Sequence, residues 1–334
     1  MGREFSRSVF REATLVSTTS LLSLLAFFPQ FPFFSTQAHA DTTPEDCSEA
    51  NDAYREEALS FDQIVARSKV FEPDRVYPLF HNDPTLPTDF SNDRGSIFMI
   101  SELELRAQLR DVVFATDTKW FSDQSGASSS SYIVSQAANL DPALYGKPLH
   151  WGVDVVTSDP FEQNTWFHSP VEFIYQGNVD LERFGMSVPV GRLVSKEDVP
   201  LSISLNGEQF ALFVVFGHML PSSYSFAPSC LVQVGDRLGD ITADEHVGSS
   251  TGPHVHMEFF GVPQTLLHSA DMDVLGLLSL HQYEERQPFL YIDPDVFLKF
   301  LPGSRRTNTG IVDGFWDLTK NKQTLERVYV KLGS

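Results

Sequence analysis

The sequence predicts a mainly β protein, in which an antiparallel sheet or sandwich is joined to a mixed N-terminal region and interrupted by a helical insertion. From residue 148 onward, short apolar runs rich in β-branched residues are separated by Gly, Pro and Asp turns. Runs of this length and spacing are typical of antiparallel sheets. The predicted strands of this part are residues 150–157, 171–176, 187–194, 201–205, 209–217, 231–234 and 254–260.

The region before residue 140 has a mixed pattern. Apolar positions within Ala53–Val70 predict a short helix, and the prolines and acidic residues of 72–95 predict an extended connector. The pattern over Ser101–Arg110 favours neither helix nor strand. The other predicted elements here are strands at Ser96–Ile100 and Val112–Ala115 and a Gly/Ser loop at Ser125–Ser131.

The C-terminal part combines helical and strand signals. Residues 262–290 form an insertion with a predicted helix from Met272 to Glu285. Asp293 is a suitable N-cap, with Pro294 at the first position of a short helix that ends at Leu301. The tail, residues 302–334, contains a predicted last strand at Arg327–Leu332.

The first 40 residues have the features of a secretory signal peptide. Three arginines precede a largely apolar stretch, and Ala38-His39-Ala40 is a suitable cleavage site, so the mature chain is expected to begin at Asp41. A membrane anchor is the competing interpretation, but the Leu21–Phe28 run is short for a span of about 20 residues. We therefore expect an exported, periplasmic or extracellular protein with no membrane span after cleavage.

The charge balance excludes one class of partner. The formal net charge is −20, and removal of residues 1–40, with three arginines and two glutamates, makes it −21. Nucleic-acid binding requires a basic face, so nucleic acid is not an expected partner. A solvated acidic surface is the simplest explanation of the charge. The chain has two cysteines, Cys47 and Cys230, and in an exported protein this pair predicts one disulfide.

The clearest functional signal is a pair of histidines, His254 and His256, in a strand-like run after the turn Ser249–Gly252. Side chains alternate along a strand, so both imidazoles are expected on one face, roughly 6.5–7 Å apart. One imidazole could bind a metal while the other faces the substrate or water that the metal activates.

Two upstream clusters can complete a metal site. His150 and Asp154 are four residues apart, and the β-branched run after Gly152 favours a strand over a helix. Gly152 would permit a bend or bulge that brings both side chains onto one ion. His218 ends another apolar strand. His150, Asp154 and one histidine of the pair would give the three protein ligands that catalytic zinc typically takes.

This arrangement resembles the lysostaphin/LytM-type zinc metalloendopeptidases, which have a groove on a β fold of the duplicated hybrid motif type. The family pattern is H-x(3)-D, then an aromatic-x-His strand end, then S-T-G-x-H-x-H. The chain carries His150…Asp154, Phe216-Gly217-His218 and Ser250-Thr251-Gly252-Pro253-His254-Val255-His256. The resemblance covers about residues 141–301. It implies one Zn²⁺ per chain held by His150, Asp154 and His256, with His218 and His254 as the catalytic pair.

The resemblance also implies a function and a domain organisation. We expect a signal peptide at 1–40, an N-terminal region at 41–140 that could occlude the zinc, a peptidase domain at 141–301 and a tail at 302–334. The expected activity is hydrolysis of peptide bonds in peptidoglycan stem peptides or cross-links by a metal-activated water. Two alternatives stay open, namely a non-catalytic regulator of other cell-wall hydrolases and a zinc protease that acts on secreted proteins.

Glu258 and the other histidines have less specific interpretations. Glu258 shares the face of His254 and His256, so it could hold one imidazole in its tautomer, or it could be a solvated strand residue. The histidines outside the motif are expected to bind no metal. They are His39, His81, His168, His246, His268 and His281.

Overall fold

The computed structural model describes most of the chain after residue 56. All described residues belong to one compact unit, Thr43–Ser334. They are residues 57–82, 95–116, 120–123, 128–129, 131–136, 138, 150–157, 165–181, 186–220, 226–241, 253–268, 274–276, 288–301 and 304–307.

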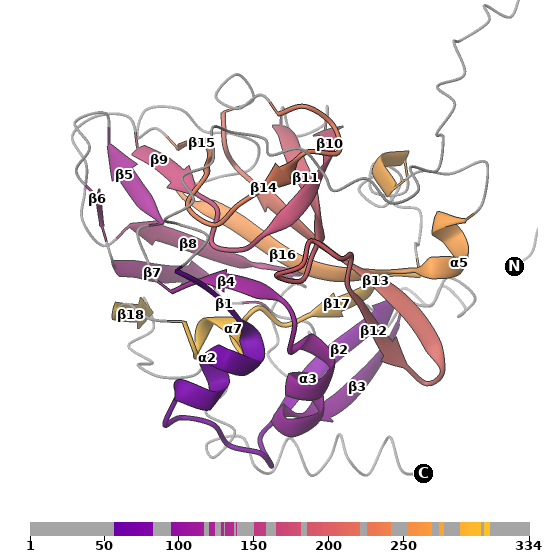
Figure 1. The fold of residues 1–334 in the computed structure, drawn as a ribbon. Helices are drawn as coiled ribbons and strands as arrows, with labels where there is room; N and C mark the ends of the chain where they lie inside the picture. Colours follow the sequence, from indigo (N-terminus) through magenta and orange to yellow (C-terminus); the bar gives the residue numbers. More distant parts are fainter. Residues whose placement is uncertain are drawn as a thin grey trace, which may run out of the picture. The chain divides into compact units, whose positions relative to one another are not determined.

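The described part of the chain is mainly antiparallel β, as predicted. Its strands form a 12-stranded sheet, a 4-stranded sheet and a 2-stranded sheet (Figure 1). In the largest sheet all pairings between described strands are antiparallel except that of β7 (Ser131–Gln136) with β18 (Ser304–Thr307), which is parallel. The predicted fold class is confirmed. Each strand predicted between residues 150 and 260 overlaps a strand of the structure, although the one predicted at 171–176 extends to Leu181.

The centre of the large sheet is built by two long strands, β13 (Glu208–Gly217) and β16 (Val255–Pro263). They pair antiparallel from Phe210↔Pro263 to Gly217↔His256. Along its other edge β16 pairs first with β8 (Val153–Thr157) and then with β17 (Leu290–Ile292). The sheet continues beyond β13 through β11 (Met186–Leu193), β10 (Phe173–Leu181) and β14 (Leu231–Val232), with β12 (Ser202–Leu205) also on β13.

The two faces of the large sheet pack separate apolar clusters. On β16 the odd-numbered residues Val255, Met257 and Phe259 belong to the larger cluster. The even-numbered Phe260 and Val262 belong to the smaller one. Because side chains alternate along a strand, His254, His256 and Glu258 lie on the face of the smaller cluster.

The N-terminal region belongs to the same sheet as the histidine strand. The strand β2 (Val76–Asn82) pairs with β17 on one side and with β3 (Gly95–Ser101) on the other. The prediction of a connector over residues 72–95 is therefore wrong for the part that forms β2. Pro78 lies outside the stretch Leu79–His81 that pairs with β17, so its missing N–H costs no bond there.

Two helices of this region pack near the C-terminal helix. The helix α2 (Phe61–Arg67) is shorter than predicted, because Ser60 caps it in a capping box with Gln63. Just before it, β1 (Ala58–Ser60) pairs with β4 (Val113–Ala115). The unassigned stretch after Ser101 is the helix α3 (Glu102–Leu109), with the Ser101 side chain accepting from the Glu104 backbone N–H.

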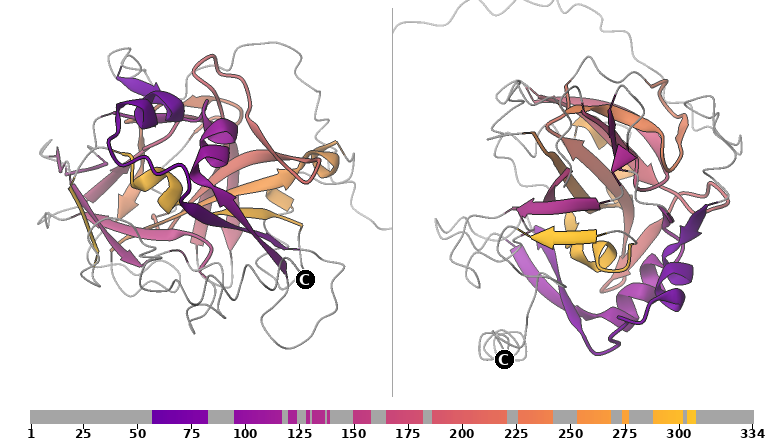
Figure 2. Two further views of the ribbon diagram at one scale, coloured as in Figure 1. Left: turned by 90° about the horizontal axis from the view of Figure 1, so that it is seen from below. Right: turned by 90° about the vertical axis from the view of Figure 1, so that its left-hand side faces the viewer.

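The C-terminal helix α7 (Asp295–Leu298), the yellow helix of Figure 2, contacts α2 through aromatic side chains. Edge-on ring contacts join Phe61 of α2 to Phe297 and to Phe300. The helix begins one residue later than predicted and ends at Leu298 rather than at Leu301. The Asp293 carboxylate still accepts from the Asp295 backbone N–H at 2.8 Å.

The remaining described elements are the 4-stranded sheet and the helical parts of the 262–290 insertion. The 4-stranded sheet contains β15 (Arg237–Ile241), β9 (Thr165–His168), β5 (Phe121–Asp123) and β6 (Ser128–Ser129), so part of the predicted Ser125–Ser131 loop is strand. Within the insertion, α5 (Gln264–Leu267) and residues 274–276 are helical. Most of the predicted Met272–Glu285 helix and the predicted strand Arg327–Leu332 lie outside the described residues, as does the predicted signal peptide. No helix among the described residues has the length and apolarity to cross a bilayer.

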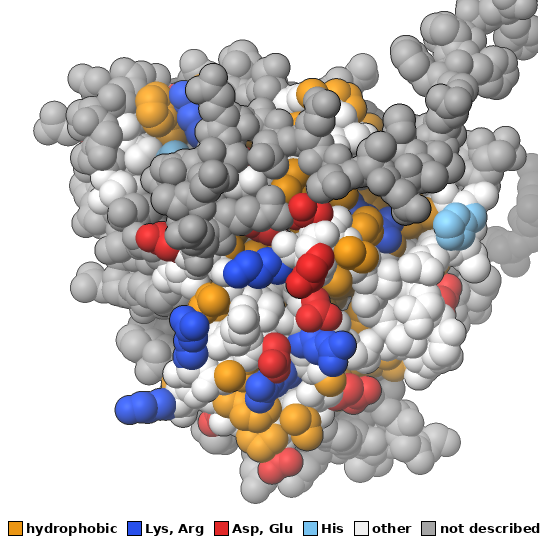
Figure 3. Space-filling view, viewed as in Figure 1, with side chains coloured by type: hydrophobic (Ala, Val, Ile, Leu, Met, Phe, Trp, Pro, Cys, Tyr) orange, Lys and Arg blue, Asp and Glu red, His pale blue; other side chains and the backbone are white. Residues whose placement is uncertain are grey.

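Charged side chains of both signs are interspersed on the described part of the face in Figure 3. Large hydrophobic side chains that are more than half exposed occur singly at three described positions, Val70, Leu103 and Val199. The described surface in this view thus has no basic patch, in line with the overall negative charge.

Candidate metal centre

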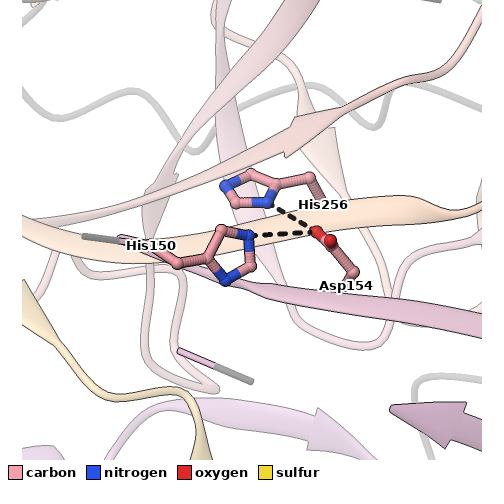
Figure 4. Close-up of side chains that lie close together, drawn as sticks. All are labelled: His150, Asp154 and His256. Atoms are coloured by element: carbon pink, nitrogen blue, oxygen red, sulfur yellow. Dashed lines mark hydrogen bonds and ion pairs between the residues drawn. The ribbon is translucent and has the colours of Figure 1, made fainter. Parts of the chain in front are cut away.

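The pairing of β8 with β16 brings three predicted ligands together. Asp154 and His256 are directly opposite in the antiparallel register, and His256 Nδ1 lies 2.8 Å from Asp154 Oδ1. His150, three residues before β8, places its Nε2 3.3 Å from the same oxygen. Figure 4 shows both imidazoles turned toward the Asp154 carboxylate.

The donor set of this cluster suits zinc. One ligand atom from each of His150, Asp154 and His256 lies within 4.8 Å of the others, and no other such group of three occurs among the described residues. Two imidazole nitrogens and one carboxylate oxygen are typical of zinc sites, and three protein ligands leave a position for water or substrate.

The predicted catalytic pair lies beside the cluster. The rings of His218 and His254 have their centroids 4.5 Å apart, and His254 Nε2 is 3.7 Å from Asp154 Oδ2. His218 follows β13 directly, one residue after Gly217, which is opposite His256. Alternation would turn His218 to the face opposite Gly217, but its backbone has φ of 63°. This left-handed conformation is uncommon for residues other than glycine, and it ends the alternation at His218.

Gly152 is required by a close approach rather than by a bulge. A Cβ at this position would lie 2.4 Å from Met257 O, 2.7 Å from Glu258 Cγ and 2.8 Å from His256 Nε2. The pairing of β8 with β16 starts at Val153 and shows no register shift. Gly152 thus lies in a bend just before β8, as expected, and its backbone packs directly against the histidine strand.

Glu258 contacts the side of His256 that faces away from Asp154. Its Oε1 lies 2.8 Å from His256 Nε2, and the Glu258 side chain is only 13% exposed. The interpretation of Glu258 as a solvated strand residue is therefore wrong. A carboxylate two residues after a histidine on the same strand face was the signal that pointed to this contact.

The electrostatics of Asp154 and His256 reflect their pairing. Burial alone would raise the pKa of Asp154, but hydrogen bonds with His150 and His256 outweigh it and hold that pKa well below its usual range. Burial alone would lower the pKa of His256, but its hydrogen bonds with Asp154 and Glu258 raise it to about 10. Both shifts favour an ionised Asp154 beside a protonated His256.

Aromatic side chains, one of them from the N-terminal region, pack next to the cluster of His150, Asp154 and His256. The Trp151 ring, next to His150 in sequence, stacks on Tyr291 of β17 at 4.2 Å and contacts Phe80 of β2 at 4.9 Å. Burial, together with the negative charge of Glu258, raises the pKa of Tyr291 well above its ordinary value. The N-terminal strand β2 thus contributes to the layer of aromatic side chains next to His150.

The histidines outside the motif that the structure describes have other surroundings. His168 Nε2 lies 2.7 Å from Ser122 Oγ and its Nδ1 2.9 Å from Gly235 O. The His81 ring packs edge-on against Phe210, and His268 is exposed. His39, His246 and His281 lie outside the described residues. Cys230 is buried and disulfide-bonded, while Cys47, the other cysteine of the sequence, lies outside them.

Comparisons with known proteins give distant structural likenesses only. No protein-family model and no curated protein matches the chain. The catalytic domain of the antimicrobial peptidase lysostaphin from Staphylococcus simulans is similar at 16% identity and a TM-score of 0.26, over 45% of this chain and 80% of that one.

Two other solved structures are similarly distant. A putative glycyl-glycine endopeptidase LytM from Ruminococcus gnavus has 14% identity and a TM-score of 0.26, over 47% of this chain and 48% of that one. Helicobacter pylori Csd3 has 15% identity and a TM-score of 0.25, over 66% of this chain and 46% of that one. The chain spans about half the length of these two proteins, and at such identities and TM-scores no activity is transferred from them.

Proposed function

We propose that this chain is an exported zinc-dependent endopeptidase of the lysostaphin/LytM type that hydrolyses peptide bonds in peptidoglycan stem peptides or cross-links. The observation that carries the proposal is the convergence of five side chains from three separate segments. His150 and Asp154 come from β8 and the residues before it, His218 follows β13, and His254 and His256 come from the start of β16.

In this proposal His150, Asp154 and His256 hold one zinc ion. Zinc held by such a set would act as a Lewis acid on the scissile carbonyl and would lower the pKa of a bound water to near 7. The Asp154 carboxylate supplies the anionic ligand, and its lowered pKa keeps it ionised throughout the neutral range.

His218 and His254 supply the proton transfers. Their rings lie side by side at 4.5 Å, next to the ligand cluster rather than within it. An imidazole in this position can accept a proton from the attacking water and return one to the leaving amine. The second imidazole of the pair can donate a hydrogen bond to the oxyanion that develops on the carbonyl.

The alternative of a non-catalytic regulator is disfavoured by the same geometry. A regulator has no need of His218 and His254 beside a complete ligand set, yet the centroid of the His218 ring lies 4.5 Å from that of His254 and 6.0 Å from that of His256. A zinc protease that acts on secreted proteins would use the same five side chains, and the products identify which substrate is cut.

The test is cleavage of peptidoglycan sacculi by the purified mature chain, with products identified by mass spectrometry. We expect newly formed peptide termini, loss of activity with a chelator, and recovery on addition of zinc. His150→Ala should lose both zinc and activity, whereas His254→Ala should keep zinc and lose activity. His268→Ala, which alters an exposed histidine, is the matched control.

Two results would contradict the proposal. Bound zinc with no cleavage of peptidoglycan, but cleavage of denatured secreted protein, would assign the chain to the protease alternative. Absence of zinc binding together with absence of cleavage would support the regulator.

A further inference from the structure

Each imidazole offers a metal only one of its two nitrogens, and which one is decided by the partner of the other nitrogen. His256 has a carboxylate on both sides. Its Nδ1 is 2.8 Å from Asp154 Oδ1, and its Nε2 is 2.8 Å from Glu258 Oε1. The two carboxylates are not equivalent, because Asp154 belongs to the ligand cluster and Glu258 does not.

The Nε2 side of His256 has no room for an ion. The backbone of Gly152 packs so closely there that a Cβ would lie 2.8 Å from Nε2 and 2.7 Å from Glu258 Cγ. On the Nδ1 side, by contrast, His150 Nε2 and Asp154 Oδ1 are themselves 3.3 Å apart. The ligand atom of His256 is therefore Nδ1, and Nε2 must carry the proton when a metal is bound.

We propose that Glu258 is a positioning residue for the metal centre: its carboxylate accepts the Nε2–H of His256 and so holds the unprotonated Nδ1 toward Asp154 and His150. The inference rests on the proposed zinc site but not on the identity of the substrate. Glu258 reaches back to the imidazole from two residues along β16, on the same face. Its side chain is 13% exposed and that of His256 is 16% exposed, so water competes little for this hydrogen bond.

The alternative tautomer explains why such a residue is needed. Without Glu258, a neutral His256 would carry its proton on Nδ1 and donate it to Asp154, because Nδ1 is already within hydrogen-bond distance of Asp154 Oδ1. That tautomer directs a proton, rather than a lone pair, at the ligand cluster. An acceptor at Nε2 favours the tautomer that binds metal.

The first experiment measures zinc affinity by competition with a chromogenic chelator in the absence of substrate. Glu258→Ala should weaken zinc binding about 10- to 100-fold, as is usual when the carboxylate partner of a ligand histidine is removed. Glu258→Gln keeps an acceptor oxygen and should recover most of the affinity. Glu208→Ala, which removes an exposed carboxylate at the start of β13, is the matched control and should leave affinity unchanged.

The second experiment reads the tautomer directly. Long-range ¹H–¹⁵N NMR of the zinc-loaded wild-type chain should show His256 with a protonated Nε2 and a zinc-bound Nδ1. The His256 Nε2 proton should exchange faster with solvent in zinc-loaded Glu258→Ala than in the wild type. Thermal unfolding of the zinc-free variants checks that each one folds.

Three outcomes would overturn the inference. They are a zinc-bound Nε2 in the wild type, a Glu258→Ala affinity equal to that of the control, and a Glu258→Gln affinity as weak as that of Glu258→Ala. The last result would indicate that Glu258 acts through its charge or as a ligand. Because zinc binding is measured without peptide, a chain that binds zinc but cuts nothing sinks the proposed function and leaves this inference standing.

Discussion

At the residue scale, the candidate metal centre depends on positions that are small or conformationally unusual. His218 adopts a left-handed backbone, which costs a residue of this kind on the order of 1–3 kcal/mol. The pairing of β13 with β11 on one edge and β16 on the other offsets this cost. The strained residue, His218, is the one whose imidazole lies beside that of His254.

Gly152→Ala tests the close approach behind His256. The added methyl must displace Met257 O, Glu258 and His256, so we expect a loss of about 1–3 kcal/mol in unfolding free energy. We also expect zinc affinity to fall at least about tenfold, because the Glu258–His256 hydrogen bond is disturbed. Chemical denaturation and chelator competition measure the two effects.

A glycine substitution elsewhere separates these effects. Gly207 has φ of 85° and no atom near its Cβ position, so Gly207→Ala should cost stability through the backbone alone and leave zinc affinity intact. Equal zinc affinities for the Gly152→Ala and wild-type chains would contradict the close packing.

Zinc binding should release a proton at neutral pH. The pKa of His256 is raised to about 10, so the zinc-free chain is protonated there at pH 7, whereas the lowered pKa of Asp154 leaves it ionised already. A ligand histidine must be neutral, so about one proton leaves His256 when zinc binds. Below the pKa of His256, the zinc affinity should therefore rise about tenfold for each pH unit. Calorimetry in buffers of different ionisation enthalpy gives the number of protons. Heats that are independent of the buffer would contradict the raised pKa.

The same shift fixes the sign of the pH dependence of stability in the zinc-free chain. The contribution of His256 is fully present below its unfolded pKa of about 6.5 and is lost as pH rises toward 10. The contribution of Asp154 is present above its unfolded value and is lost only in strong acid. The midpoint temperature of thermal unfolding of the zinc-free chain should therefore decrease as the pH rises from 7 to 10. His256→Gln should make this midpoint depend less on pH.

At the element scale, a buried charge network joins α3 to the C-terminal helix. Glu102, the first residue of α3, is 1% exposed and accepts from Tyr77 Oη at 3.0 Å and from the Glu72 backbone N–H at 2.7 Å. Its carboxylate also pairs with Lys299, just after α7. A carboxylate buried to this extent requires partners, since an isolated buried charge is strongly unfavourable.

Lys299→Ala should therefore destabilise the chain by about 3–5 kcal/mol, because it leaves the Glu102 charge buried without its cation. Chemical denaturation measures the change. The double variant Glu102→Gln/Lys299→Ala should recover part of the loss, since the uncompensated charge is gone. Lys69→Ala, at an exposed lysine, is the control. A loss below about 1 kcal/mol, typical of surface pairs, would show that the network is not buried in solution.

At the scale of the whole molecule, the N-terminal region is part of the fold that carries the candidate metal centre. Strands β2 and β3 extend the sheet beyond β17, and Phe61, Tyr77 and Leu79 belong to the larger apolar cluster. Phe80 packs on Trp151 beside His150. The predicted boundary at 140/141 and occlusion of zinc by residues 41–140 stay predictions, and the contacts of β2 argue for a structural contribution by this region.

Removal of residues 41–140 tests these two views. A chain that begins at residue 141 would expose the β17 edge and the apolar residues that α2 and β2 cover. We expect it to lose cooperative thermal unfolding and zinc binding together, as seen by circular dichroism and zinc analysis. A trimmed chain that folds, binds zinc and cuts peptidoglycan faster than the full mature chain would instead support occlusion.

The sequence by itself determined the antiparallel β class, because alternation along strands is a local property. It also predicted the five side chains of the candidate site, His150, Asp154, His218, His254 and His256, which the structure brings close together. It did not show that residues 76–82 pair with a strand more than 200 positions away, since prolines and acidic residues conceal a strand whose partner is distant. It also left the role of Glu258 open. Only the tertiary structure showed its contact with His256, because that contact depends on how closely Gly152 lets two strands approach.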